Sequence, residues 1–128
     1  MKKILFVCIE NSNRSQMAQA FVNMYGEGKA EAWSAGSRPS GVVNPRAIKA
    51  MAELGYDLST HRSDGLDDVP QDGYDYAITM GCGDACPMIA AENRLDWDLP
   101  DPKAMAPEEF NVVRDTIRER VEGLLAQF

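Results

Sequence analysis

A cysteine and an arginine near the start of the chain have the spacing of an oxyanion-binding loop. The complete stretch reads Cys8, Ile9, Glu10, Asn11, Ser12, Asn13, Arg14 and Ser15. When such a loop joins a strand to a helix, its backbone N–H groups can point inward, and the helix N-terminus adds partial positive charge. The Arg14 guanidinium can then donate two parallel hydrogen bonds to a tetrahedral oxyanion. We therefore predict that residues 9–15 bind such an anion.

The same loop makes Cys8 the candidate nucleophile, because the positive potential that attracts an anion also stabilises a thiolate. Ser15 is expected to donate a hydrogen bond to that thiolate. Asn11 is the expected brace, since Asn tolerates a left-handed backbone and can bond across a tight loop. The alternative is a buried cysteine at a strand end beside an unrelated surface arginine. The Cys-x5-Arg-Ser pattern, placed between a strand and an amphipathic helix, favours the functional interpretation.

The other two cysteines, Cys82 and Cys86, form a close pair. If residues 82–86 are helical, the two Cα atoms lie roughly 6 Å apart, which a disulfide can bridge. Three cysteines in a reducing compartment indicate catalytic, redox or metal-binding roles rather than a disulfide framework. Inert core thiols and a metal site are the alternatives, although the pair and His61 cannot complete a tetrahedral zinc set without carboxylates. His61 itself is expected to be an ordinary surface histidine.

Apolar periodicity predicts alternating strands and helices that would position these residues. The expected strands are residues 3–8, 30–34 and 74–80, and the expected helices are residues 14–25, 45–54 and 107–125. This alternation indicates an α/β fold with a parallel sheet and helices on both faces. Ligands of such sheets bind beyond the carboxyl ends of the strands, and Cys8 and Cys82 both fall at such ends.

Composition restricts the classes of partner. The chain has 128 residues, which we assign to one domain, 1–128. Its formal net charge of −7 argues against nucleic acid but not against one small anion held by a few donors. The first apolar run is too short for a signal peptide, and no stretch approaches the roughly 18 apolar residues of a membrane span. We expect a cytoplasmic monomer that binds neither nucleic acid nor a membrane.

These motifs resemble the low-molecular-weight protein tyrosine phosphatase superfamily. The resemblance covers almost the whole chain, from Val7-Cys8 through Ser34-Ala35-Gly36 to Asp101-Pro102. It implies a single-domain α/β fold with a four-stranded parallel sheet flanked by helices on both faces. It also implies that Asp101 protonates the departing oxygen. Two very different functions share this scaffold, so fold and loop cannot choose between them.

Other residues resemble the thioredoxin-coupled arsenate reductases, which act in arsenical resistance. Phosphatase members carry an aromatic residue after the acidic motif, whereas this chain has Asp101-Pro102-Lys103. The cysteine pair and residues 15–18 and 44–47 also look like the reductase branch. Reducing arsenate takes two electrons, hence two thiols that end as a disulfide. A third thiol lets that disulfide move to where a partner can reach it.

The resemblance implies a relay in which Cys8 attacks arsenic, Cys82 attacks Cys8, and Cys86 then attacks Cys82. Thioredoxin is the expected reductant. A glutaredoxin or a low-molecular-weight thiol is the alternative, because the spacing of the cysteine pair is shorter than in the reductases it resembles. The competing functions are a tyrosine phosphatase of the same fold and a non-enzymatic oxyanion or thiol-redox sensor.

No bound cofactor or metal is expected. Members of the superfamily can hold a potassium ion behind the loop, and the matching positions are Asn11, Gln19, Ser34 and Asp64. Gln19 replaces an acidic residue there, which removes charge that a cation favours, so potassium is not among the expected cofactors.

Overall fold

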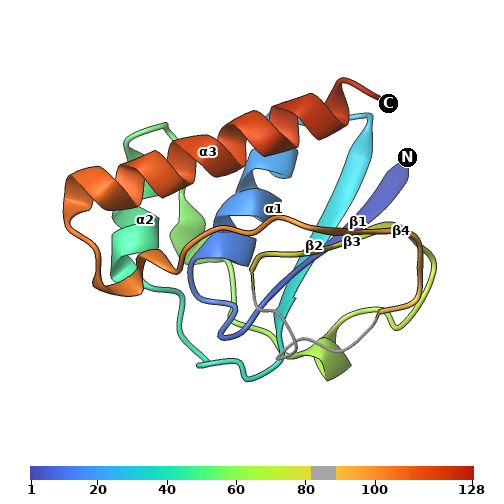
Figure 1. Cartoon of the computed structure of the whole chain (residues 1–128), viewed down its shortest axis with the longest axis horizontal. Coiled ribbons are helices and arrows are strands. Elements are labelled where there is room, and N and C mark those ends of the chain that lie inside the picture. The colour runs from blue at the N-terminus through green and yellow to red at the C-terminus, as the bar shows by residue number, and fades with distance from the viewer. Residues whose placement is uncertain (82–88) are drawn as a thin grey trace.

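Four parallel strands form the centre of the computed structural model, which describes residues 1–81 and 89–128. The strands are β1 (Lys2–Cys8), β2 (Ala30–Gly36), β3 (Tyr74–Thr79) and β4 (Ala91–Asp96). They lie in the order β2-β1-β3-β4, and each neighbouring pair is parallel (Figure 1). The expected α/β fold with a four-stranded parallel sheet is confirmed.

The α-helices are α1 (Arg14–Tyr25), α2 (Pro45–Ala52) and α3 (Pro107–Leu125), and α3 packs across α1 and α2 (Figure 1). α2 begins with Pro45 in its first turn, and the Asn44 side chain caps it by accepting the Arg46 N–H at 2.9 Å. One-turn 3-10 helices lie at Leu58–Thr60, Leu66–Asp68 and Pro102–Ala104. Within the described ranges, no helix combines the length and apolar character that a membrane crossing requires.

The side chains of β1 divide between two apolar clusters, which explains its continuous apolar sequence. The first cluster joins Ile4 and Phe6 to buried residues of all three α-helices, among them Met17, Phe21, Met51 and Ile117. The second joins Leu5 and Val7 to residues of the opposite face, among them Val69, Tyr74 and Leu66. Both faces of the sheet are therefore covered. α-Helices cover one, and the 3-10 helix Leu66–Asp68 with its neighbours packs on the other.

The strand that apolar periodicity does not predict is β4. Five of its six residues are exposed, and its sequence is largely polar. It lies at the edge of the sheet, where pairing with β3 rather than burial makes it a strand. β2 also runs past the expected end at Ser34, because Ala35 and Gly36 pair with Val7 and Cys8 of β1.

The carboxyl ends of β1 and β3 form the switch point of the sheet. The chain passes from β1 outward to β2 and from β3 outward to β4, although β1 and β3 are neighbours. Doubly wound sheets bind ligands in the crevice at such a point. Cys8 ends β1, and the Met80 N–H just beyond β3 donates to the Val7 carbonyl at 2.9 Å. The candidate nucleophile therefore lies at the rim where a ligand is expected.

Candidate active site

The backbone of residues 8–15 is arranged as an anion nest. Its carbonyl groups accept hydrogen bonds from outside the loop, at 2.8–3.2 Å, and the acceptor residues are Cys8, Ile9, Glu10, Ser12 and Asn13. By contrast, the backbone N–H groups of residues 9–15 have no acceptor in the part of the chain that the structure describes. Buried N–H groups are almost always paired, so a run of them without acceptors indicates a ligand. The geometry supports the oxyanion loop predicted from the sequence.

Asn11 holds the loop in shape. Its backbone φ of 51° is the left-handed conformation that Asn tolerates, and the residue is fully buried. Its side-chain oxygen accepts hydrogen bonds from Gln16 Nε2 at 2.9 Å and the Asp64 N–H at 2.7 Å. Its side-chain nitrogen donates to Ser15 Oγ at 2.8 Å. These three bonds fix the orientation of the amide, as expected of a residue that braces the loop.

Gly36 provides the surface on which the loop rests. A Cβ atom at this position would lie 2.6 Å from the Ile9 carbonyl oxygen and 2.9 Å from the Asn11 nitrogen. Both neighbours are backbone atoms, so any side chain at position 36 displaces the loop. The glycine that ends β2 is thus part of the construction of the site.

The sulfur of Cys8 lies 2.8 Å from Ser15 Oγ, and both residues are buried. Because Ser15 Oγ already accepts a hydrogen bond from Asn11, its own proton remains for the sulfur. A hydroxyl that donates to Cys8, at the N-terminal end of α1, stabilises the thiolate form. This geometry suits the role of nucleophile that the sequence predicts for Cys8.

Arg14 is anchored to the backbone just beyond the ends of β3 and β4. Its Nη1 donates to the Met80 carbonyl at 2.6 Å and to the Leu99 carbonyl at 3.0 Å, and the side chain is buried. Its Nε and Nη2 have no acceptor among residues 1–81 and 89–128. The predicted bidentate hydrogen bonding to an anion therefore falls to these two nitrogens, since Nη1 is engaged.

Asp101 comes from a distant part of the chain and reaches the same pocket. It is exposed, it caps the 3-10 helix Pro102–Ala104, and its Oδ1 accepts the Lys103 N–H at 3.0 Å. The pocket is lined by Cys8, Ile9, Glu10, Ser12, Asn13, Arg14 and Asp101. An exposed carboxyl group beside a thiolate and an anion site can serve as a proton donor to a leaving oxygen.

Gly81 brings the chain to the rim of this pocket. Its φ of +84° is left-handed, and a Cβ there would lie 2.7 Å from the Leu99 carbonyl oxygen and 3.3 Å from Arg14 Nη1. The next residue is Cys82, and both Cys82 and Cys86 lie outside the described residues. The predicted roles of this pair and the helical geometry expected of residues 82–86 therefore remain predictions.

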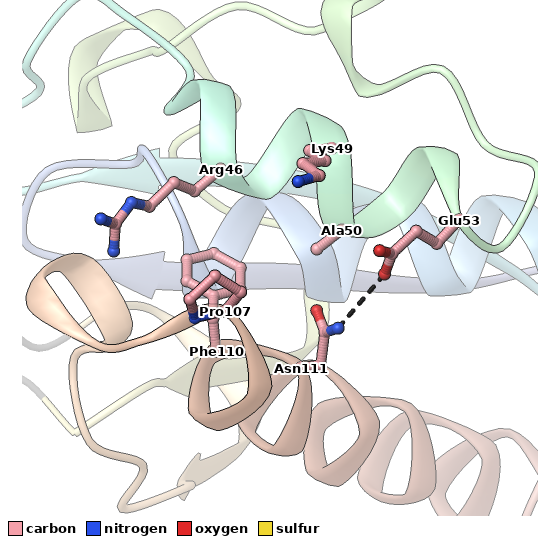
Figure 2. Close-up of a pocket in the computed structure, with 7 residues that line it drawn as sticks. All are labelled: Arg46, Lys49, Ala50, Glu53, Pro107, Phe110 and Asn111. Carbon is pink, nitrogen blue, oxygen red and sulfur yellow. Dashed lines mark hydrogen bonds between the residues drawn. The ribbon is translucent and has the colours of Figure 1, made fainter.

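A second pocket lies between α2 and α3, away from the loop (Figure 2). Its lining residues are Arg46, Lys49, Ala50, Glu53, Pro107, Phe110 and Asn111. The Asn111 side chain donates to Glu53 at 3.2 Å across one end of it. None of the candidate site residues lines this pocket, and it contains no thiol.

Residues 3–128 match the sequence profile of the family described as low molecular weight phosphotyrosine protein phosphatase. The chain belongs to this family. A relative from Synechocystis sp., named glutaredoxin arsenate reductase, is 42% identical over 130 residues, which are 99% of this chain and 98% of the relative. The superfamily resemblance read from the loop and the Asp-Pro motif is confirmed.

Solved structures of arsenate reductases share the architecture. One, described as an arsenate reductase in the phosphate binding state, has a TM-score of 0.91 and 42% identity and covers 99% of this chain and 98% of its own. Another is the Corynebacterium glutamicum thioredoxin-dependent arsenate reductase Cg_ArsC1'. It has a TM-score of 0.80 and 32% identity, and the match covers 99% of this chain and 61% of that one.

In this member of the phosphatase family, His61 is part of the site's support. Its Nδ1 lies 2.9 Å from Gln16 Oε1 and its Nε2 lies 2.6 Å from the Tyr56 hydroxyl. Gln16 in turn donates to Asn11, so a continuous network joins His61 to the loop. The expectation of an ordinary surface histidine is wrong. Burial also lowers the pKa of His61 below its ordinary value.

No signal in the local sequence around His61 indicates that network, since the ring meets a glutamine 45 positions earlier in the chain.

The positions that match the family's potassium site are hydrogen-bonded to one another in pairs. Ser34 Oγ donates to Gln19 Oε1 at 2.6 Å, and the Asp64 N–H donates to the Asn11 side chain. Within the described ranges, no cluster of three or more His, Cys, Asp or Glu side chains is suited to a metal ion.

Proposed function

We propose that the chain is an arsenate reductase that holds arsenate in residues 9–15 and attacks it with Cys8. The observation that carries this proposal is the run of backbone N–H groups in residues 9–15 that have no acceptor among the described residues. These groups lie beside Cys8, which is buried and hydrogen-bonded to Ser15. The names of the relatives support arsenate as the oxyanion, since one is a glutaredoxin arsenate reductase and others, from Bacillus cereus among them, are arsenate reductases.

In the first step, the Cys8 thiolate forms a bond to arsenic. An arsenate hydroxyl leaves as water, with the proton supplied by Asp101, and arsenic remains pentavalent. The backbone N–H groups of the loop and Arg14 hold the remaining oxygens and stabilise the charge that builds up on them. Ser15 donates a hydrogen bond to the Cys8 sulfur before the attack.

The electrons move in the second step. The Cys82 thiolate attacks Cys8 Sγ, the sulfur–arsenic bond breaks, and its electron pair stays on arsenic, which departs as arsenite. A Cys8–Cys82 disulfide remains. Cys86 then attacks Cys82, which frees the Cys8 thiolate and leaves a Cys82–Cys86 disulfide.

An external thiol reductant completes the cycle by reducing the Cys82–Cys86 disulfide. Thioredoxin is our first choice, and the thioredoxin-dependent enzyme of Corynebacterium glutamicum supports it. The Synechocystis relative is named for glutaredoxin, which supports a glutaredoxin-type partner instead. Either partner is consistent with a protein that works in the reducing cytoplasm.

The second candidate function is phosphotyrosine hydrolysis. The family and the presence of Cys8, Arg14 and Asp101 around one pocket favour it. That reaction uses the same nucleophile and proton donor but no second thiol. We expect it at most as a side activity.

The test is NADPH oxidation that depends on arsenate, measured with thioredoxin and thioredoxin reductase, and in parallel with glutaredoxin, glutathione and glutathione reductase. The same protein is assayed for aryl phosphate hydrolysis, and Cys8→Ser is the inactive control in each assay. Arsenate-dependent turnover with at least one of the two systems is the expected result. Aryl phosphate hydrolysis alone would assign the protein to the phosphatases.

A further inference from the structure

Two carboxylates border a pocket built for an anion. Glu10 and Asp101 both line the pocket of Cys8, where Arg14 supplies one positive charge. Phosphate and arsenate carry up to two negative charges at neutral pH. Carboxylates at the mouth of such a site repel these anions unless a cation compensates them.

Glu10 is held at this mouth by its backbone. Its carbonyl oxygen accepts the Ser40 N–H at 3.0 Å and the Ser63 hydroxyl at 3.0 Å. Ser40 precedes α2 and Ser63 follows it, so two separate segments hold the backbone of residue 10 in place. The charge of its side chain therefore acts on the pocket in every state of the loop that keeps these bonds.

Lys103 is the cation that meets this carboxylate. Its Nζ lies 2.9 Å from Glu10 Oε1, although 93 positions separate the two residues. Its backbone N–H also donates to Asp101, so one residue contacts both acidic groups of the pocket. The hydrogen bond to Glu10 raises the pKa of Lys103, and the charges of Glu10 and Asp101 raise it further. Lys103 therefore stays protonated.

We propose that Lys103 is a positioning residue that cancels the charge of Glu10, so that the loop accepts divalent oxyanions. The Glu10–Lys103 pair also ties the loop to the turn that carries Asp101. Exposed ion pairs of this kind contribute little to folding stability, and the side chains of Lys103 and Glu10 are 57% and 36% exposed. The pair is therefore expected to affect anion binding rather than the stability of the fold.

This inference rests on the loop being the oxyanion site of the proposed function, and its test needs no arsenate turnover. The rate at which iodoacetamide alkylates Cys8 is measured at low ionic strength with increasing inorganic phosphate. Mass spectrometry identifies the modified cysteine. The proteins compared are the wild type, Lys103→Met, Glu10→Gln and the double variant. Lys49→Met is the matched control, since it removes the same charge from the pocket between α2 and α3 (Figure 2).

In Lys103→Met, the phosphate concentration that gives half-maximal protection of Cys8 is expected to rise about 3- to 10-fold. This is the effect expected from removing one poorly screened charge near the site. The loss should shrink as salt is added. Glu10→Gln should bind phosphate at least as well as the wild type, and the double variant should return to within about twofold of it. Lys49→Met should have no effect.

Two results would overturn the inference while leaving the proposed function intact. If phosphate protects Cys8 as well in Lys103→Met as in the wild type, Lys103 has no role in binding. If the double variant is as weak as Lys103→Met, then Lys103 contacts the anion directly and Glu10 is irrelevant. If phosphate fails to protect Cys8 in the wild type, the oxyanion site itself is wrong, and both proposals fall.

Discussion

The two regions that meet at the anion pocket are held in place in different ways. The loop of residues 8–15 is braced by the buried side chains of Asn11 and Ser15, whose hydrogen bonds run through Gln16 to His61. The turn that carries Asp101 is exposed and is held by its cap and by the ion pair of Lys103. The shape of the loop is thus fixed before an anion arrives, whereas Asp101, the proposed proton donor, lies on a solvent-exposed turn.

This difference separates the effects expected of substitutions in each region. A change in the buried network should damage stability, binding and chemistry together, because the same bonds serve all three. A change in the exposed turn should damage chemistry or anion affinity with little loss of stability.

The largest effect is expected from Asn11→Ala. It leaves the Asp64 N–H and Ser15 without their buried partner and puts alanine in a left-handed conformation, so the free energy of unfolding should fall by about 2–4 kcal/mol. Phosphate should no longer protect Cys8. Asn11→Gly is the control, since glycine accepts this backbone and should recover about 1 kcal/mol. Urea unfolding measures both, and a wild-type midpoint for Asn11→Ala would contradict the role of the brace.

Asp101→Asn should slow the chemical step without destabilising the fold. Asparagine keeps an oxygen that can accept the Lys103 N–H but cannot donate a proton as an acid, so kcat for arsenate should fall about a hundredfold. The melting temperature should stay at the wild-type value, and phosphate should protect Cys8 at least as well, because one carboxylate that borders the pocket is gone. Asp98→Asn, an exposed aspartate nearby, is the control. Unchanged kcat in Asp101→Asn would remove Asp101 from the mechanism.

Ser15→Ala should have a smaller effect. It removes the hydroxyl that donates to Cys8, so the rate of alkylation of Cys8 near neutral pH should fall by about tenfold. Iodoacetamide labelling followed over pH 5–9 measures this rate. Denatured protein is the reference, in which the wild type and the variant should react equally. Equal rates in the folded proteins would mean that the 2.8 Å contact does not stabilise the thiolate.

The smallest effect concerns the pH dependence of stability. Because burial depresses the pKa of His61, the unfolded chain binds a proton more readily than the folded one as pH falls below about 6.5. His61 thus contributes stability that is present above its unfolded pKa and is lost as pH falls through the lower folded pKa. The melting temperature of the wild type should fall more steeply between pH 7 and 5.5 than that of His61→Gln. Parallel curves would mean that folding does not depress the pKa of His61.

Sequence reasoning succeeds where the signal is local. The loop lies between a strand and a helix, and Pro107–Leu125 has the predicted helix bounds because its apolar period is regular. Sequence reasoning fails where residues far apart in the chain come into contact. β4 is polar and needs β3 as a partner, and the Nη1 anchors of Arg14 lie 66 and 85 positions away. The pairing of Glu10 with Lys103 spans a similar distance, so no pattern of spacing predicts it.

The most direct test of the central claim uses fully reduced wild-type protein mixed anaerobically with excess arsenate and no reductant. Arsenate reduction by the relay predicts about one arsenite released per protein molecule and the loss of two of the three cysteine thiols. Peptide mapping should place the resulting disulfide between Cys82 and Cys86. Retention of all three thiols with no arsenite formed, in protein that hydrolyses aryl phosphates, would contradict the account and leave a phosphatase in its place.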